Sequence, residues 1–296
     1  MKEPVAVVVP VYRSDLSGDE QRSLEQCLKV LGSHPIRLIG PESFDLRAFV
    51  ESYRLPESVK MERFDDGHFR GIRDYNRLML EPRFYKRFEK FERILIHQLD
   101  SWVFRDELLN WCRKGFDYIG GLWFEGFQGE FFSDRLLLPG NGGLSLRRVE
   151  AMRMILEKRP RLRDADWLTD RFLNPKFSFR ARLRQRILFP LRLLGWRNRI
   201  GDEQWVGRIN EDIFFAKVAP RRVRRFEVPS VEKAFLFSWD QRPEELFKRF
   251  GSLPFGCHGW SRDDGVYRGN RRFWAEILQK SANRFSEESK MDSLSA

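Results

Sequence analysis

The sequence predicts an α/β fold in which helices flank a doubly wound mixed sheet. Three observations indicate this class: a nearly continuous apolar run at residues 5–11, an amphipathic helix pattern directly after it, and a second apolar run at residues 93–99. Continuous apolar runs are typical of strands covered on both faces, and alternating strand and helix patterns indicate parallel βαβ units. With 296 residues, of which 42% are hydrophobic, the chain is long enough to build one large domain.

The first elements follow in strand, helix, strand order. Residues 5–11 predict a central parallel strand, since five of these seven are valine. Ser17 and Glu20 have the spacing of a capping box and begin a helix pattern that Gly32 ends. Residues 36–39 predict the second strand.

The alternation continues further along the chain. Residues 75–91 predict a mainly helical segment, 93–99 a buried strand, 106–114 a short helix, and 117–120 another strand. Asp100 follows the buried strand at once. In an open α/β sheet this is the carboxyl edge, where nucleotides bind, although an acidic residue there could equally cap the next turn.

Two segments after residue 120 leave this pattern. Residues 122–138 carry aromatic side chains among glycines and charges, which indicates either a lid over the site or ordinary surface packing. Residues 139–147 contain a glycine cluster that enters a strand or helix, where side-chain-free backbone lets a ligand come close.

The formal charge of +11 is concentrated in one segment. Residues 171–200 contain nine basic residues and no acidic ones: Arg171, Lys176, Arg180, Arg182, Arg184, Arg186, Arg192, Arg197 and Arg199. Apolar residues recur there near helical spacing, so the segment predicts a basic amphipathic insertion that lies on an anionic membrane surface or docks on the protein's own core. Residues 281–296 predict a disordered polar tail after a single domain of residues 1–280.

Other classes of protein find little support in the composition. No run approaches the length of a spanning helix, and the start of the chain lacks the pattern of a signal peptide. The cysteines Cys27, Cys112 and Cys257 are too far apart for a zinc motif or a disulfide framework. We therefore expect a cytoplasmic protein with reduced cysteines.

Five short motifs carry a resemblance to a known family. They are Tyr75-Asn76-Arg77-Leu78, Gln98-Leu99-Asp100, Gly140-Asn141-Gly142-Gly143, Asn210-Glu211-Asp212 and Phe255-Gly256-Cys257-His258. In this order the chain resembles GT-A-fold (Rossmann-type) nucleotide-sugar glycosyltransferases, and more closely an uncharacterised family of bacterial and fungal glycosyltransferase-like domains. The resemblance spans residues 4–262 without the basic segment.

The resemblance implies a role for each motif. Asp212 matches the carboxylate that takes the acceptor proton, with Glu211 as its catalytic neighbour. Asp100 and His258 match ligands of a divalent cation, Mg²⁺ or Mn²⁺, on the donor diphosphate. The expected donor-binding residues are Pro10, Val11, Tyr12, Arg13, Arg73, Asn76, Arg77, Asp100 and Ser101. The expected acceptor- or sugar-binding residues are Trp123, Gly140, Asn141, Gly142, Gly143 and Trp260.

One position departs from the family pattern. Trp102 stands where the second acidic residue of the GT-A Asp-x-Asp motif is expected. The metal then either relies on Asp100, His258 and phosphate oxygens or is not needed, in which case Arg13, Arg73 and Arg77 supply the positive charge. The sequence leaves both alternatives open.

The leading hypothesis is a glycosyltransferase that moves a sugar from a nucleotide-sugar donor to a hydroxyl of a glycan or lipid-linked acceptor, in bacterial surface polysaccharide synthesis. It would be a cytoplasmic enzyme, peripheral on the inner face of the membrane through residues 171–200. Two alternatives are a basic nucleic-acid-binding protein and a catalytically inactive GT-A scaffold. No standard nucleic-acid motif is present, so we expect no nucleic-acid partner.

Overall fold

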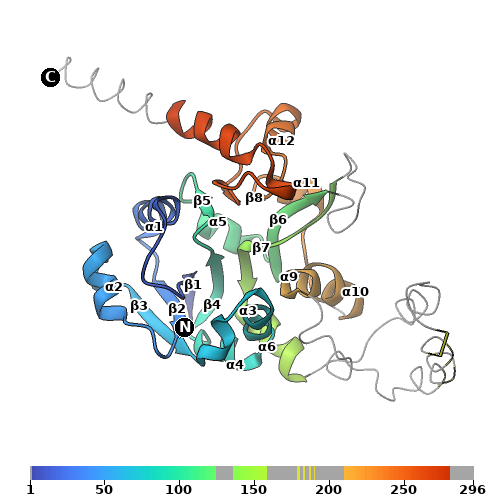
Figure 1. Cartoon of the computed structure of the whole chain (residues 1–296). Helices are drawn as coiled ribbons and strands as arrows, with labels where there is room; N and C mark the ends of the chain where they lie inside the picture. Colours follow the sequence, from blue (N-terminus) through green and yellow to red (C-terminus); the bar gives the residue numbers. More distant parts are fainter. Residues whose placement is uncertain are drawn as a thin grey trace.

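The core of the protein is a single mixed sheet. The computed structural model describes residues 2–124, 136–158, 210–223 and 225–280, with a few positions between 179 and 190 (Figure 1). In these residues the strands are β1 (Glu3–Pro10), β2 (Ile36–Pro41), β3 (Lys60–Phe64), β4 (Phe91–His97), β5 (Ser101–Val103), β6 (Tyr118–Phe124), β7 (Leu136–Arg148), β8 (Ser238–Trp239) and β9 (Gly256–His258). Their order across the sheet is β3-β2-β1-β4-β7-β6-β8-β9-β5.

Most neighbouring strands in this sheet run parallel. β1 pairs with β2 and β4 in parallel, and β6, β8 and β9 continue in the same direction, whereas β7 and β5 run against their neighbours. The prediction of a doubly wound mixed α/β sheet with flanking helices is therefore confirmed.

Helices cover both faces of the sheet. They are α1 (Gly18–Leu31), α2 (Leu46–Tyr53), α3 (Ile72–Met79), α4 (Pro82–Arg87), α5 (Leu108–Arg113), α6 (Val149–Lys158), α9 (Glu211–Ile213), α10 (Ala219–Arg222), α11 (Val231–Ala234) and α12 (Pro243–Phe250). Shorter helical turns are η1 (Asp66–Phe69), η3 (Phe214–Val218) and η4 (Gly265–Tyr267), and residues 270–280 are also helical.

The central strand β1 shows why its sequence is apolar throughout. Val5, Val7 and Val9 join the hydrophobic cluster that includes side chains of α1, α2, α5, α11 and α12. Ala6 and Val8 join a second cluster with side chains of α3, α4, α6 and η3. Successive side chains of a strand point to opposite faces, so both faces of β1 are covered, as predicted.

The predicted capping box begins α1. The Ser17 hydroxyl accepts a hydrogen bond from the Glu20 amide at 3.3 Å, and the Glu20 carboxylate accepts one from the Ser17 amide at 2.8 Å. Two amides at the start of the helix thereby gain partners, and Gly32 is the residue that follows its end.

Three features differ from the prediction. The helical segment at 75–91 is two helices, since α3 ends at Met79 and Pro82 begins α4. Both α2 and β3 were not predicted from the sequence. The prediction of an irregular segment at 122–138 is wrong at its two ends, which belong to β6 and β7, because aromatic residues are favoured in strands.

Some predictions fall outside the described residues. These include residues 125–135 of the segment 122–138, for which a lid and surface packing were the alternatives, most of the basic segment at 171–200, and the tail at 281–296. Of the basic segment, Phe179, Leu183 and Ile187 are described, and they are helical and exposed. Among the described helices, none combines the length and apolar character needed to cross a bilayer.

Candidate functional site

A cavity lies where the carboxyl ends of β1 and β4 meet the glycine cluster of β7. It has a volume of about 550 Å³. Pro10 at the end of β1 and Asp100 after β4 line it, and so do Gly142 and Gly143. The carboxyl edge of parallel strands is where open α/β sheets bind ligands, so this cavity is the candidate site.

Gly142 and Gly143 bring the backbone of β7 unusually close to functional side chains. A Cβ atom at Gly143 would lie 2.2 Å from Nε2 of His258, and one at Gly142 would lie 2.4 Å from Oε1 of Glu211. Neither position has room for a side chain. Two glycines therefore form the wall on which His258 and the Glu211–Asp212 pair converge.

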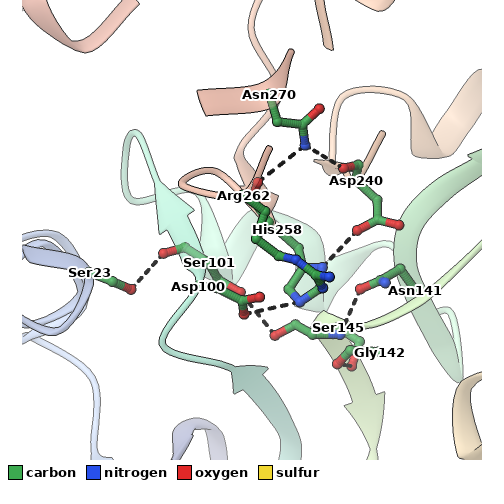
Figure 2. A network of polar contacts seen from close by, with 12 residues as sticks. Ser23, Asp100, Ser101, Asn141, Gly142, Ser145, Asp240, His258, Arg262 and Asn270 are labelled. Carbon is green, nitrogen blue, oxygen red and sulfur yellow. Dashed lines mark hydrogen bonds and ion pairs between the residues drawn. The ribbon is translucent and has the colours of Figure 1, made fainter. Parts of the chain in front are cut away.

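His258 lies between two carboxylates (Figure 2). Its Nε2 is 3.1 Å from Oδ1 of Asp100, and its Nδ1 is 2.7 Å from Oδ1 of Asp240. Burial favours the neutral imidazole, but the charges and hydrogen bonds of Asp100 and Asp240 outweigh it and raise the pKa of His258 to about 10. Burial alone would raise the pKa of Asp100. The charge of His258 and its hydrogen bond to Asp100 outweigh burial, so the pKa of Asp100 is lowered.

Asp240 is held in place by burial and by Asn270. Its side chain is completely buried, and the Asn270 amide donates hydrogen bonds to the carbonyl oxygens of Asp240 at 2.9 Å and Gly259 at 3.2 Å (Figure 2). These contacts connect Asp240 to Gly259, the residue after His258. The orientation of the imidazole is therefore set by Asp240, which does not line the cavity, together with Asp100, which does.

A second buried ion pair supports the other side of the cavity. Arg147 is fully buried, and its Nη1 and Nη2 atoms each lie 3.0 Å from an oxygen of Glu211. The same guanidinium donates to the Tyr85 hydroxyl at 3.1 Å and to the Gly142 carbonyl at 3.4 Å. Glu211 thus faces Arg147, and its place at the start of α9 fixes the following residue, Asp212.

Asp212 lines the cavity without a cationic partner at hydrogen-bond distance among the described residues. Burial, and next the negative charge of Glu211, raise its pKa to about 7. A carboxyl group with this pKa can accept a proton near neutral pH. Of the two predicted catalytic acids, the geometry thus leaves Asp212 the better placed to accept one.

Asn76 connects two of the sequence motifs. Its Nδ2 donates to Oδ1 of Asn210 at 3.2 Å, and its Oδ1 accepts from the Glu211 amide at 3.1 Å. An amide at the start of α9 is satisfied in this way. Asn76 lines the cavity and also holds the chain that carries Asp212.

The metal ion implied by the sequence resemblance can be tested against the donor set. The described residues contain no group of three or more His, Cys, Asp or Glu side chains that could hold a metal ion. At the cavity the Asp100 carboxylate lies beside His258, whereas the Asp240 carboxylate on the other side of the ring is completely buried, and Trp102 packs on Trp260 with ring centroids 4.9 Å apart. Mg²⁺ and Mn²⁺ prefer several oxygen ligands, so an ion held by Asp100 and His258 would also need oxygens of the donor diphosphate.

The structure brings most of the predicted residues to the cavity. The predicted residues that line it are Pro10, Tyr12, Arg13, Asn76, Asp100, Asn141, Gly142, Gly143, Glu211, Asp212 and His258. Those that do not line it are Val11, Arg73, Arg77, Ser101, Trp123, Gly140 and Trp260.

The residues away from the cavity have other contacts. Val11 is buried in the core, and the Ser101 hydroxyl donates to the Gly143 carbonyl at 3.1 Å. Arg77 pairs with Asp74 on an exposed helix face. Trp123 packs against Gly140, where a Cβ would lie 2.3 Å from its ring.

Several residues of the site were not predicted from the sequence. Arg70 and Arg262 line the cavity, while Asp240 and Arg147 hold groups that line it. Arg147 was detectable in principle, because it alternates with the apolar residues of β7 and should therefore have raised the question of its buried partner. Asp240 follows a strand of two residues, which gives no periodic signal.

One family model matches residues 58–258 and is described as "Protein of unknown function (DUF5672)". No curated protein matches the chain.

Among solved structures the chain is similar to mouse xyloside xylosyltransferase 1 (apo form), with 14% identity and a TM-score of 0.47 over 88% of this chain and 98% of that one. A glycosyltransferase involved in glycosylation of the major capsid of PBCV-1 matches with 12% identity and a TM-score of 0.39 over 86% and 93%. The mannosyltransferase Ktr4p from S. cerevisiae in complex with GDP matches with 11% identity and a TM-score of 0.33 over 42% of this chain and 41% of that chain. The match thus covers about two fifths of the mannosyltransferase's length.

Proposed function

The chain belongs to this family of unknown function, DUF5672, and from its site we propose that it is a glycosyltransferase that uses a nucleotide-sugar donor. The observation that carries the proposal is the pairing of Asp212, a carboxyl group with a pKa of about 7, with cationic side chains in one cavity. Sugar transfer needs both: a base for the acceptor hydroxyl and positive charge for the departing diphosphate.

The proposed reaction assigns one proton and one leaving group. The acceptor hydroxyl gives its proton to Asp212, its oxygen forms a bond to the anomeric carbon of the sugar, and the bond from that carbon to the diphosphate oxygen breaks. His258, Arg13 and Arg262 lie around the same cavity and would stabilise the negative charge that develops on the diphosphate. The fixed imidazole and the glycine wall keep these groups in position without reorganisation.

The shape of the site suits a nucleotide. A volume of about 550 Å³ falls within the usual range of small-molecule sites, and Tyr12 at its rim is half exposed, so a planar ring is available to a base. The position at the carboxyl edge of β1 and β4 is also the usual place for nucleotides in α/β sheets.

The acceptor and its location form a finer part of the proposal. Phe179, Leu183 and Ile187 recur at every fourth residue and are exposed, which favours a membrane surface over the protein's own core for this apolar stripe. We therefore propose a glycan or lipid-linked acceptor and a cytoplasmic enzyme that is peripheral on the inner face of the membrane. Co-sedimentation with anionic but not neutral vesicles tests this part, and equal binding to both would contradict it.

A donor panel tests the main proposal. Purified protein is incubated with UDP-, GDP- and CMP-sugars, and both binding and donor hydrolysis are measured. One donor class should bind and turn over, and Asp212→Asn should lower turnover at least about 100-fold while leaving donor affinity within about twofold. Glu57→Gln, a comparable change at an exposed position, should leave both unchanged. If no nucleotide of any class binds, the proposed function is wrong.

A further inference from the structure

Arg262 is a cationic side chain of the cavity that is placed to bind an anionic ligand. It lines the cavity together with Asp100 and His258, all three of which are labelled in Figure 2, and its charge acts on the Asp100 carboxylate. The sequence motifs do not include it as a site residue, and the described residues contain no group of three or more His, Cys, Asp or Glu side chains that could hold a metal ion in its place.

The backbone that carries Arg262 is fastened over Asp100. The Trp260 amide donates to the Asp100 carbonyl at 3.2 Å, and the Arg271 amide donates to the Arg262 carbonyl at 3.0 Å. Gly259, between His258 and Trp260, has a φ of +62°, which lets the chain turn sharply after β9. Arg262 is therefore held in place before any ligand binds.

The guanidinium group is fixed on one edge. Its Cζ lies 4.0 Å from the centre of the Tyr267 ring, and its Nε and Nη2 donate to the Asp264 carboxylate at 2.9 and 2.8 Å. Its Nη1 makes no hydrogen bond to the part of the chain that the structure describes. A guanidinium presents donors on two edges, so the second edge remains for an anion.

The charges around the cavity favour Arg262 over Arg13. Arg13 is paired with Glu20, and both line the cavity, so its charge is already largely balanced. Arg262 has the exposed Asp264 as its partner instead, where water screens the pair. A diphosphate carries about two negative charges when esterified to a sugar, and a fixed arginine matches phosphate oxygens in geometry as well as in charge.

We propose that Arg262 binds the diphosphate of the nucleotide-sugar donor in the place of a divalent cation, so that donor binding needs no metal ion. The inference rests on the proposed function, since it names the diphosphate-binding group of that same site. It accounts for Trp102 as well: with a guanidinium over Asp100, a second carboxylate for a metal is not required.

Calorimetric titration of the full-length protein with UDP and GDP, in EDTA and in Mn²⁺, tests the inference. One of the two diphosphates should bind in EDTA, with an affinity within about threefold of that in Mn²⁺. Arg262→Ala should weaken its binding about 10- to 100-fold, as expected for loss of a charge-assisted contact. Arg262→Lys should lie between the two, because lysine keeps the charge and loses the planar fork.

Two controls separate a specific contact from general damage. Arg268→Ala removes the same charge six residues later at an exposed position outside the cavity, and should change affinity less than about twofold. The corresponding nucleoside, followed by ligand-observed NMR, should bind wild type and Arg262→Ala within about threefold, because it has no phosphate to lose.

The outcomes are distinct. Binding that appears only with Mn²⁺ would overturn the inference and leave the proposed glycosyltransferase intact. Binding in EDTA that Arg262→Ala leaves unchanged would overturn the role of Arg262. If neither diphosphate binds in either condition and the wider donor panel also fails, the proposed function itself is wrong.

Discussion

Two cations flank the glycine wall, and they differ in what they can reach. His258 lies between Asp100 and Asp240, and the Asp100 side chain is 29% exposed at the cavity. Arg147 is 0% exposed, and the groups around it are Glu211, Tyr85, Ser145 and the Gly142 carbonyl. The first ion pair is open to the ligand site, whereas in the second pair Arg147 is sealed inside the protein behind Glu211, whose side chain is 4% exposed at the cavity.

This difference indicates separate tasks for similar chemistry. A buried ion pair contributes little net stability over apolar packing, but the loss of one partner leaves an uncompensated charge. We expect Arg147 and Glu211 to position α9 and Asp212. We expect His258 to act on the ligand, because a phosphate can compete with the Asp100 carboxylate for the imidazole.

The largest expected effect is on the sealed pair. Arg147→Met leaves Glu211 buried and unpaired, which should lower the free energy of unfolding by about 3–5 kcal/mol in urea denaturation. Arg153→Met, the same change in an exposed pair with Glu157, should cost less than about 1 kcal/mol. Arg147→Met/Glu211→Leu should recover much of the loss, since no lone charge remains.

A loss in Arg147→Met no larger than in Arg153→Met would break the comparison. It would mean that Glu211 finds water or another partner at once, and that α9 does not depend on the pair. If the double variant recovers stability but not sugar transfer, the comparison becomes sharper. The correct position of Asp212 would then be shown to need the Arg147–Glu211 pair itself.

The second prediction concerns the open side of the wall. Gly143→Ala places a Cβ 2.2 Å from Nε2 of His258, so the imidazole must leave its present position between Asp100 and Asp240. Donor affinity should fall about 10- to 100-fold, the range found when groups that orient a metal-binding side chain are mutated. Gly18→Ala, where the added methyl meets open space, is the matched control and should change neither affinity nor stability appreciably.

Wild-type donor affinity in folded Gly143→Ala would show that His258 does not depend on the glycine wall. Circular dichroism and thermal unfolding of both glycine variants distinguish this result from misfolding.

The two sides of the wall also differ in how far the sequence revealed them. The fold followed from periodicity, because β1 and α1 carry patterns that burial requires, and the residues at Asp100, Gly142, Gly143, Asp212 and His258 came from motifs. The roles given to these residues stay predictions. What the sequence could not show are contacts between distant segments.

Particular residues show the physical reason. Arg77 was chosen for its charge, but it pairs with Asp74 on the outside of α3. Arg262 was overlooked because its position depends on the turn at Gly259 and on the Trp260 amide, neither of which has a sequence period. Asp240 binds His258 across 18 positions of sequence, and only the packing of β8 beside β9 brings them together.

The third prediction concerns the pH dependence of the reaction, which depends on Asp212 beside the Arg147–Glu211 pair. Asp212 must be deprotonated to act as a base, so kcat/KM should fall about tenfold per pH unit below its pKa of about 7 and level off above it. Glu211→Gln removes the like charge that helps raise this pKa, after burial, and should move the midpoint to lower pH. Glu157→Gln, at a partly exposed position, should leave the midpoint of the pH profile unchanged. An unchanged midpoint in Glu211→Gln would contradict the idea that Glu211 raises the pKa of Asp212.

The smallest effect is expected where the family pattern would suggest the largest. Trp102→Asp restores the second acidic residue of the motif, yet it should not create a requirement for Mn²⁺. In β5, Trp102 pairs with Cys257 and packs on Trp260, whereas the neighbouring Ser101 bonds to the Gly143 carbonyl. Since side chains alternate along a strand, a carboxylate at position 102 points away from the glycine wall. The affinity of Trp102→Asp for the diphosphate, measured by calorimetric titration with and without Mn²⁺, should match that of wild type, and Trp102→Phe is the packing control. If Mn²⁺ raises the affinity of the Trp102→Asp variant alone, the site beside His258 would be shown to be a metal site that lacks one ligand.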